Sequence, residues 1–382
     1  MTVVQYPCST GFVLGHYLNP KYFTYVDTIS TDKFVYPVNI RDLAFSLGIS
    51  REDLWEKHTR DIDIKETFFD CIPNHVLKKI QHGDVKLLIN YGYEGNSIDE
   101  RDTILYLEKF IVRILNKKNI KPENVYYTDS NLEIDNFRFN SSLNIFSHNY
   151  CALDFLTKAD NVKEVDTPYN GFLLSERWEN HFFKSDITKK FICYNRLHKN
   201  HRYKIVNWLK TNDYLDDGLV SYLEEHNNLK LILEDDLDMK MKLSYDKNYK
   251  DHYLKTFFSI VTESYFDSTS RLFLTEKTWK PILNYHPFVI LGQSGILKYL
   301  KKEGFDIFED IFDSSYDKVH SKKVRFTMII EILNDFIKDN NISDLKRLRK
   351  KIQTRLIDNK NHFWNSFIPK CEEQLYVNLR RK

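Results

Sequence analysis

The apolar residues of the first half of the chain form short continuous runs, separated by a stretch with helical spacing. Asp84–Tyr91 is a compact apolar run closed by Gly92, and Asn124–Asp129 is a second, so both are predicted to be strands. Between them, Asp99–Lys117 carries apolar residues three and four positions apart, which predicts an amphipathic helix. Leu143–Phe146 is a further candidate strand. Strand, helix and strand with short connections indicate a parallel α/β architecture.

The same alternation returns in the second half, from about Lys189, after the polar and mixed stretch Asn161–Thr188. The predicted strands and helices are, in order, Lys190–Tyr194, Arg202–Thr211, Phe257–Thr262, Glu276–Leu283, His286–Leu291, Gly295–Lys302, Lys322–Lys338 and a last helical stretch, Ser343–Lys382. Two α/β units of similar size are therefore expected, with a cleft between them. Ligands of such sheets bind in the loops at the carboxyl ends of the strands.

Composition and charge exclude several classes of protein. The 382 residues correspond to two domains at roughly 150 residues each, and 42% hydrophobic with 29% charged residues is typical of a soluble globular chain. Fifty-six basic and 54 acidic residues leave a net charge of +2, which gives no sign of a nucleic-acid binder. The five cysteines are scattered, which favours a reducing cytoplasmic location over a disulfide framework or a zinc site. No apolar run reaches the ~18–20 residues of a membrane span, and no signal peptide is recognisable.

The segment Asn195–Arg202, with the sequence NRLHKNHR, links a predicted strand to a predicted helix. Helix N-termini attract anions, because their first N–H groups lack partners and the helix dipole is positive there. Arg196, Lys199 and Arg202 add positive charge, and guanidinium groups bind phosphate oxygens through paired hydrogen bonds. The segment is therefore a candidate diphosphate site. The alternative is a basic loop that is simply solvated.

A second constellation joins Glu263, at the end of a predicted strand, to Thr275-Glu276-Lys277 at the start of a helix. Two carboxylates in these positions are well placed to accept hydrogen bonds from both hydroxyls of a ribose, and Lys277 would neutralise a phosphate. The alternative is local helix capping, with Thr275 as the N-cap residue and Glu276 in the first turn.

These residues carry a resemblance. The segment Phe257–Gly292 resembles the donor-binding segment of GT-B glycosyltransferases related to the α1,3-fucosyltransferases, and glycosyltransferases of phages and giant viruses. The shared features are Glu-Ser after a strand, Thr-Glu-Lys opening a helix, a following apolar strand, and the Gly, Leu and Phe pattern of Gly295–Asp313. The resemblance covers about residues 188–320. It implies an α/β fold of two Rossmann-like domains in the GT-B arrangement.

That arrangement gives the domains expected roles. Residues 1–185 would be an N-terminal acceptor-binding domain, and residues 186–345 a C-terminal domain that binds the nucleotide sugar. Residues 346–382 would form a C-terminal helix that packs back toward the first domain. This last stretch is rich in basic residues, which are either only surface or contacts to an anionic acceptor such as DNA, or to a membrane surface.

The resemblance also implies roles for single residues in the donor pocket. Glu276 would hold the nucleotide ribose, next to Thr275, and Lys277 would bind the diphosphate. The family continues Thr-Glu-Lys with Leu or Phe, then Trp and Arg-Asn, whereas this chain has Thr278, Trp279, Lys280 and Pro281. The nucleotide and sugar are therefore not assigned, and GDP-fucose is not assumed.

The remaining residues of the pocket come from both constellations. Arg202 would bind the diphosphate together with Lys277, and Arg196 would assist. Glu263, a candidate catalytic residue, would contact the donor sugar or position the basic pair. Asn195 would line the same pocket.

A general base is needed to deprotonate the acceptor hydroxyl of an inverting transferase. Glu94 is the first candidate, because it follows the clearest strand of the first half and is flanked by Gly92 and Gly95, which leave room for an acceptor. The alternative is a polar turn residue. Asp129, His148 and Asp154 are reserve candidates.

The acidic run Glu234–Asp238 contains the spacing with which some glycosyltransferases hold a metal ion on a diphosphate. It is interpreted as a solvated charged face, because Lys277 and the arginines already supply positive charge for the leaving group. No metal site and no resident cofactor are predicted.

The sequence thus predicts an inverting, metal-independent glycosyltransferase. It would move a sugar from a nucleotide diphosphate donor to a hydroxyl of a glycan or a protein. One alternative is a phage-type enzyme that acts on hydroxymethylated bases of DNA. A second alternative is a protein that binds a nucleotide or carbohydrate without catalysis.

Overall fold

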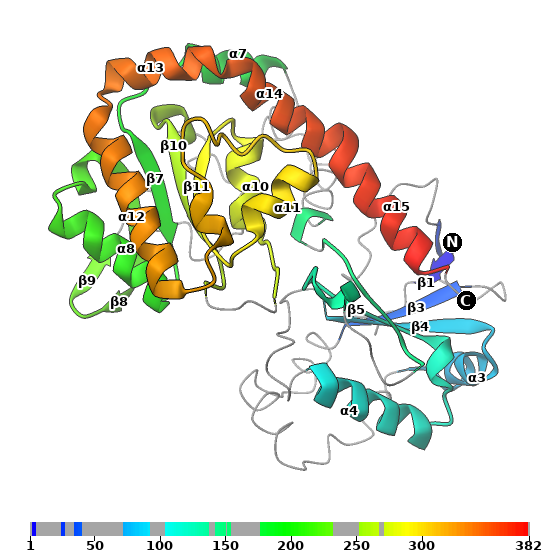
Figure 1. Cartoon of the computed structure of the whole chain (residues 1–382). Helices are drawn as coiled ribbons and strands as arrows, with labels where there is room; N and C mark the ends of the chain where they lie inside the picture. The colour runs from blue at the N-terminus through cyan, green and yellow to red at the C-terminus, as the bar shows by residue number, and fades with distance from the viewer. Residues whose placement is uncertain are drawn as a thin grey trace. The chain divides into compact units, whose positions relative to one another are not determined.

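The computed structural model describes residues 2–4, 24–26, 34–39, 72–91, 104–136, 142–149, 151–153, 176–231, 252–266 and 271–380. The chain is α/β, with two sheets of mainly parallel strands (Figure 1). It divides into two compact units. Unit 1 comprises Met1–Asp160, Ser270–Phe273 and Ile368–Lys382, and unit 2 comprises Asn161–Thr269 and Leu274–Phe367. Residues 161–185, expected in the first domain, thus belong to unit 2, and of the expected C-terminal helix only residues 368–382 belong to unit 1.

Unit 1 contains a six-stranded parallel sheet of order β2-β1-β3-β4-β5-β6. The strands are β1 (Thr2–Val4), β2 (Thr24–Val26), β3 (Phe34–Asn39), β4 (Val85–Tyr91), β5 (Val125–Asp129) and β6 (Asn144–Ser147). The helices of this unit are α3 (Asn74–His82), α4 (Ile104–Lys117) and α15 (Ile368–Asn378), with 3-10 turns η2 (Pro122–Asn124) and η3 (Ile134–Asn136). Every residue of β5 is buried, as expected for a parallel strand covered on both faces.

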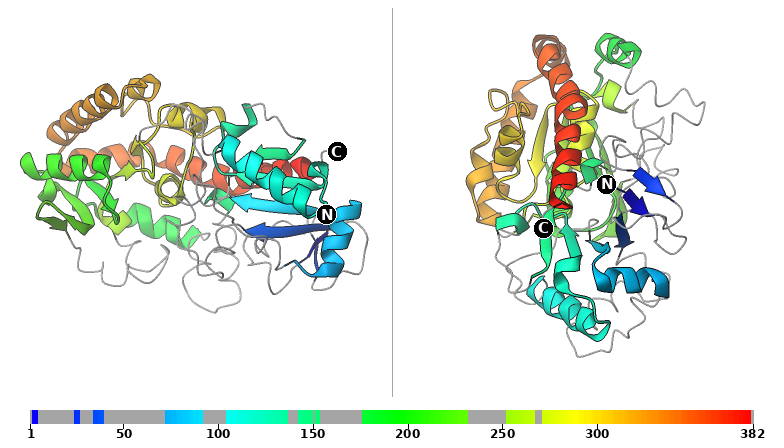
Figure 2. Two further views of the ribbon diagram at one scale, coloured as in Figure 1. Left: turned by 90° about the horizontal axis from the view of Figure 1, so that it is seen from below. Right: turned by 90° about the vertical axis from the view of Figure 1, so that its right-hand side faces the viewer.

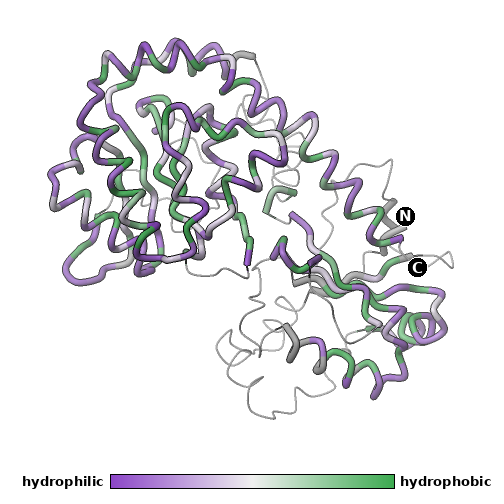
Figure 3. Tube along the Cα trace, in the orientation of Figure 1, coloured by the Kyte–Doolittle hydropathy of each residue, from purple (hydrophilic) through white to green (hydrophobic). Residues whose placement is uncertain are grey.

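Unit 2 contains a five-stranded sheet of order β11-β10-β7-β8-β9, whose strands are labelled in Figure 1; Figure 2 gives two further views. The strands are β7 (Phe191–Asn195), β8 (Gly218–His226), β9 (Leu229–Leu231), β10 (Phe258–Thr262) and β11 (Phe288–Leu291). Only the edge strand β9 runs antiparallel to its neighbour. Figure 3 shows the strands β7, β10 and β11 with many apolar positions, whereas helix α13 is mostly polar.

The helices of unit 2 connect these strands and close its far end. They are α7 (Glu176–Lys184), α8 (Asn200–Thr211), α10 (Glu276–Leu283), α11 (Ile296–Lys302), α12 (Lys322–Asp339), α13 (Ile342–Lys351) and α14 (Gln353–His362), with 3-10 turns η4 (Leu215–Asp217) and η6 (Ser315–Lys318) and the π-helical turn η7 (Phe363–Phe367). The two strands and the helix predicted for the β10–α10–β11 segment are confirmed, with ends that agree to within two residues. The last helical stretch is interrupted: α13 and α14 meet at Ile352, and η7 separates α14 from α15.

The strand order of unit 2 defines where its loops diverge. From β7 the chain moves to β8 on one side, whereas β10 pairs with the other side of β7. The connections after β7 and β10 therefore leave the sheet in different directions, and the carboxyl ends of these two strands lie side by side. In open parallel sheets this switch point is where ligands bind.

Candidate functional site

The carboxyl end of β10 carries a fully buried carboxylate, Glu263, whose side chain is 0% exposed. Its Oε1 accepts hydrogen bonds from the backbone N–H of Thr275 at 3.0 Å and from the hydroxyl of Thr278 at 2.6 Å. Its Oε2 accepts from the N–H of Ser264 at 3.0 Å and from the hydroxyl of Thr275 at 2.7 Å. Four donors thus compensate the desolvation of the charge.

These four contacts make Glu263 the anchor of the α10 N-terminus. Thr275 is the N-cap residue of α10, and its hydroxyl oxygen accepts from the backbone N–H of Lys277 at 3.3 Å. Because both oxygens of Glu263 are occupied within the protein, the arrangement favours a positioning role over contact with a donor sugar. The sequence analysis did not single out Thr278, although its place one turn after Thr275 was a readable signal.

The first turn of α10 presents an ion pair at the surface of this network. Lys277 Nζ lies 2.8 Å from Glu276 Oε1, and both side chains are about a third exposed, at 28% and 33%. Burial raises the pKa of Glu276, but the charges of Lys277 and Lys280 outweigh it and hold this pKa at about 2. Glu276 is therefore ionised at neutral pH and can accept hydrogen bonds from hydroxyl groups.

Arg202, in the first turn of α8, is the most unusual cation of the site. It is 4% exposed, and among the described residues no carboxylate forms an ion pair with it. Its Nη1 donates to the carbonyl of Leu197 at 3.2 Å, and its Nη2 donates to the carbonyls of Thr262 and Glu263 at 3.4 and 3.3 Å. Its Nε is buried and has no hydrogen-bond partner in the part of the chain that the structure describes. Burial lowers the pKa of Arg202, against the opposing charges of Glu263 and Glu276.

The loop between β7 and α8 holds the other predicted donor residues. Asn195 is buried, and its side-chain oxygen accepts from the hydroxyl of Thr262 at 2.7 Å, which joins the ends of β7 and β10. Arg196 is exposed and has no partner within the described part of the chain. Lys199 is the N-cap position of α8, and its side chain makes no capping hydrogen bond. The α8 N-terminus therefore lacks the side-chain acceptor that completes α10.

Unit 2 thus brings seven of the eight predicted site residues to one edge of its sheet, the carboxyl ends of β7 and β10. They are Asn195, Arg196, Arg202, Glu263, Thr275, Glu276 and Lys277. The eighth, Glu94, lies outside the described residues, as do the reserve candidate Asp154 and the acidic run Glu234–Asp238.

The two other reserve candidates lie at the carboxyl edge of the sheet of unit 1. Asp129 ends β5 and is fully buried, and its Oδ1 accepts from the backbone N–H of Asn131 at 2.8 Å. His148 follows β6, and its backbone N–H donates to the carbonyl of Asp129 at 3.0 Å. Burial lowers the pKa of His148 to about 4, against a hydrogen bond with the backbone of Asp129. It is therefore neutral at pH 7.

Neither a metal-ligand cluster nor a membrane span is present in the described ranges. No three side chains among the described His, Cys, Asp and Glu residues lie close enough to share a metal ion. No helix in those ranges combines the length and apolarity that crossing a bilayer demands. Comparison of the chain with protein-family models, with curated proteins and with solved structures finds no match.

Proposed function

We propose that unit 2 binds a nucleotide diphosphate sugar at the carboxyl ends of β7 and β10, and that the protein transfers the sugar to a hydroxyl acceptor. The observation that carries the proposal is Arg202, a buried guanidinium whose Nε has no partner, and which pairs with no carboxylate, among the residues that the structure describes. A buried cation is costly unless an anion compensates it. A diphosphate supplies that charge, and the uncapped α8 N-terminus beside it adds a second reason for an anion to bind.

The site residues divide the remaining tasks. Arg202, Arg196 and Lys277 bind the diphosphate and stabilise its charge as it leaves. The ionised Glu276 accepts hydrogen bonds from the ribose hydroxyls. Glu263 and Asn195 act indirectly: they fix α10 and the β7 loop, so that the charged groups are already in place before the ligand arrives.

The proposed reaction is a single displacement with inversion. The acceptor oxygen attacks the anomeric carbon while the bond from that carbon to the diphosphate oxygen breaks, and the acceptor proton passes to a general base. No covalent sugar intermediate and no metal ion is invoked. In GT-B terms, unit 2 is the donor domain and unit 1 the acceptor domain, in a cytoplasmic protein.

Glu94 is the proposed general base. In the sequence it follows β4, whose last residue, Tyr91, pairs with Asp129 at the carboxyl edge of the sheet of unit 1. Replacement of Glu94 by Ala should abolish turnover while leaving donor affinity unchanged, and Glu94→Gln serves as the isosteric variant. Unchanged turnover in both variants would exclude Glu94 and move the role to Asp129 or His148.

The first test is a thermal-shift screen of the purified protein with UDP, GDP, CMP and dTDP, with and without Mg²⁺. A ligand that binds only the native state raises Tm by mass action. A shift with one nucleotide identifies the donor class, and an equal shift without Mg²⁺ supports metal independence. No shift with any nucleotide would contradict the proposal.

A second test separates a transferase from a non-catalytic binding protein. The matching nucleotide sugar is incubated with hydroxyl acceptors of each class: an oligosaccharide, a peptide and a DNA duplex that contains hydroxymethylated bases. Release of the nucleoside diphosphate shows transfer, and its dependence on one acceptor distinguishes a glycan or protein enzyme from a DNA enzyme. Binding without release to any acceptor would favour the non-catalytic alternative.

A further inference from the structure

The loop that joins β11 to α11 carries a buried amide with no hydrogen bond. Gln293 is 2% exposed, and within the described part of the chain neither its Oε1 nor its Nε2 has a partner. A carboxamide offers two donor hydrogens and an acceptor oxygen. Burial without partners therefore costs free energy for the NH₂ group and for the oxygen alike. The sequence analysis did not single out this residue.

This unpaired amide does not reflect a loosely held loop. On one side, Gly292 follows the last residue of β11 and is closely packed: a Cβ there would lie 2.4 Å from a side-chain carbon of Ile296. On the other side, Asp317 accepts hydrogen bonds from the backbone N–H groups of Gly295, Leu297 and Lys298, at 2.9 to 3.1 Å. Gln293 is therefore held between two fixed points.

The same loop borders the site of unit 2. The backbone N–H of Glu263 donates to the carbonyl of Leu291 at 2.9 Å. A Cβ on Gly292 would also lie 3.5 Å from Cβ of Glu263. Gln293 thus follows the strand next to β10, at the same carboxyl edge of the sheet as Glu263.

We infer that Gln293 is a specificity-determining residue, whose amide binds a group of the nucleotide sugar that both donates and accepts hydrogen bonds. The inference rests on the proposed function. Two parts of such a ligand have this chemistry: neighbouring hydroxyls of the sugar, and the N–H and C=O edge of a uracil, thymine or guanine base. A rigid, pre-organised site of this kind loses little conformational entropy when the ligand binds. It rejects ligands that lack the matching hydrogen-bonding groups.

The variant that tests this is Gln293→Met, which keeps the length of the side chain and removes the amide. Gln353→Met makes the same change at the start of α14 and is the control. Because the amide has no partner among the described residues, Gln293→Met should melt at the same temperature as the wild type or higher. A Tm several degrees lower would overturn the inference, since it would show that the amide is already bonded within the protein.

Calorimetric titrations then compare wild type and both variants with a nucleoside diphosphate and with its nucleotide sugar, for example UDP and UDP-glucose. We expect Gln293→Met to raise Kd at least ~10-fold, the loss of one or two well-made hydrogen bonds. A loss for both ligands assigns the amide to the base, and a loss for the nucleotide sugar alone assigns it to the sugar. Unchanged Kd for both would overturn the inference. A wild type that binds no nucleotide would instead overturn the proposed function, and the inference with it.

Discussion

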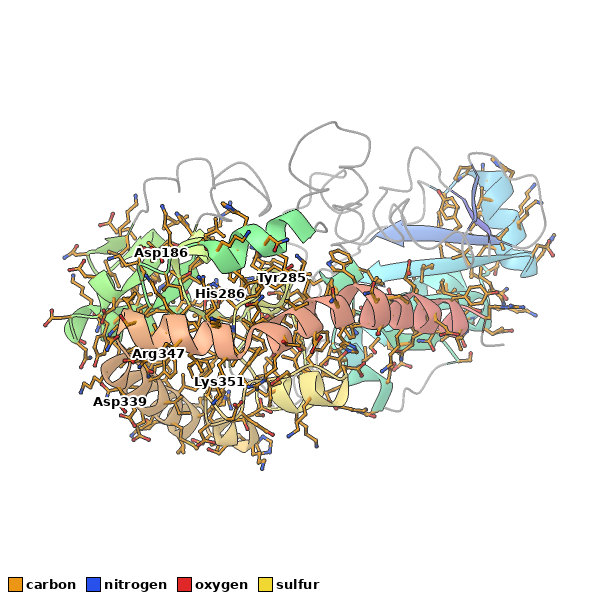
Figure 4. The ribbon with its side chains drawn as sticks, turned by 90° about the horizontal axis from the view of Figure 1, so that it is seen from above. Asp186, Tyr285, His286, Asp339, Arg347 and Lys351 are labelled. Carbon is orange, nitrogen blue, oxygen red and sulfur yellow. The ribbon has the colours of Figure 1, made fainter. Side chains whose placement is uncertain are left out.

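Two pairs of buried residues, one pair at each end of the unit 2 sheet, differ in how their polar atoms are paired. At the amino end, before β11, Tyr285 and His286 are buried with their polar atoms paired (both are labelled in Figure 4). His286 Nδ1 lies 3.1 Å from the hydroxyl of Ser259, and its Nε2 lies 2.9 Å from the carbonyl of Tyr253. The Tyr285 hydroxyl accepts from Lys360 Nζ at 2.9 Å. At the carboxyl end, Arg202 Nε and both polar atoms of Gln293 have no partner in the described part of the chain.

This difference distinguishes polar groups whose hydrogen bonds stabilise the fold from polar groups that can still form hydrogen bonds with a ligand. A buried polar group that is paired within the protein contributes to stability or costs little, whereas an unpaired one lowers it. Arg202 and Gln293 both lie at the carboxyl edge of this parallel sheet, and under the proposed function a ligand completes them. The comparison predicts that substitutions of paired groups, such as His286 and Glu263, alter stability, and that substitutions of Arg202 and Gln293 alter binding.

The largest effect is expected for Arg202→Met. It removes the charged donor that we propose for the diphosphate, and one such hydrogen bond is worth about 1.5–3 kcal/mol, or roughly 10- to 100-fold in Kd. The matched control is Arg349→Met, since Arg349 is also a buried arginine of unit 2, and its Nη1 has no partner among the described residues. Calorimetry should show weakened nucleotide binding for the first variant only. Equal weakening in both would show that the effect is not local to the carboxyl edge.

Glu263→Gln should act on stability rather than on chemistry. An amide in place of the carboxylate sets an NH₂ group against at least one of the four donors, so about 2 kcal/mol of the free energy of unfolding should be lost. Denaturant unfolding measures this, with Glu331→Gln on the exposed face of α12 as the control. A variant as stable as the wild type, but inactive, would instead assign Glu263 a catalytic role.

The smallest expected effect is a dependence of stability on pH that originates at the amino end. Burial lowers the pKa of His286 to about 3, below the ~6.5 of an unfolded chain. The unfolded state therefore binds the proton first as pH falls. The stabilisation by neutral His286 is complete above pH ~6.5 and decreases below it, by at most about 1.4 kcal/mol per pH unit.

Unfolding measured between pH 7.5 and 5 in wild type and His286→Asn tests this. The variant should be less stable at pH 7.5 and should show the smaller slope, while the buried His148 of unit 1 contributes equally to both. Equal slopes would mean that the native and unfolded states bind this proton equally, so that the pKa of His286 is not lowered in the folded protein.

The sequence predicts the framework of the site better than its contacts. The strands β7 and β10 and the helices α8 and α10 were readable because buried parallel strands are continuous apolar runs and the helices are periodic. β8 was missed. Its first residue, Gly218, is a weak strand former, and it is required because a Cβ there would lie 2.3 Å from the ring of Phe191, a contact between distant segments.

The environment of single residues was not readable in the same way. Glu263 was expected from its place after a strand, but its four donors come from two elements that meet only in the folded unit. Gln293 carries no motif, and only its burial without partners distinguishes it. Local sequence patterns predict helices and strands. The hydrogen-bond partners and the burial of a side chain depend instead on tertiary packing.

The most direct test of the central claim is amide hydrogen exchange of the whole chain with and without the nucleoside diphosphate that gives the largest thermal shift. Binding at the carboxyl edge should slow exchange in residues 195–203, 263–266, 275–280 and 292–297. Residues 182–190 and 284–288, at the amino end of the same sheet, should exchange as before. Protection that is confined to the amino end, or absent from both ends while the ligand binds, would contradict the account.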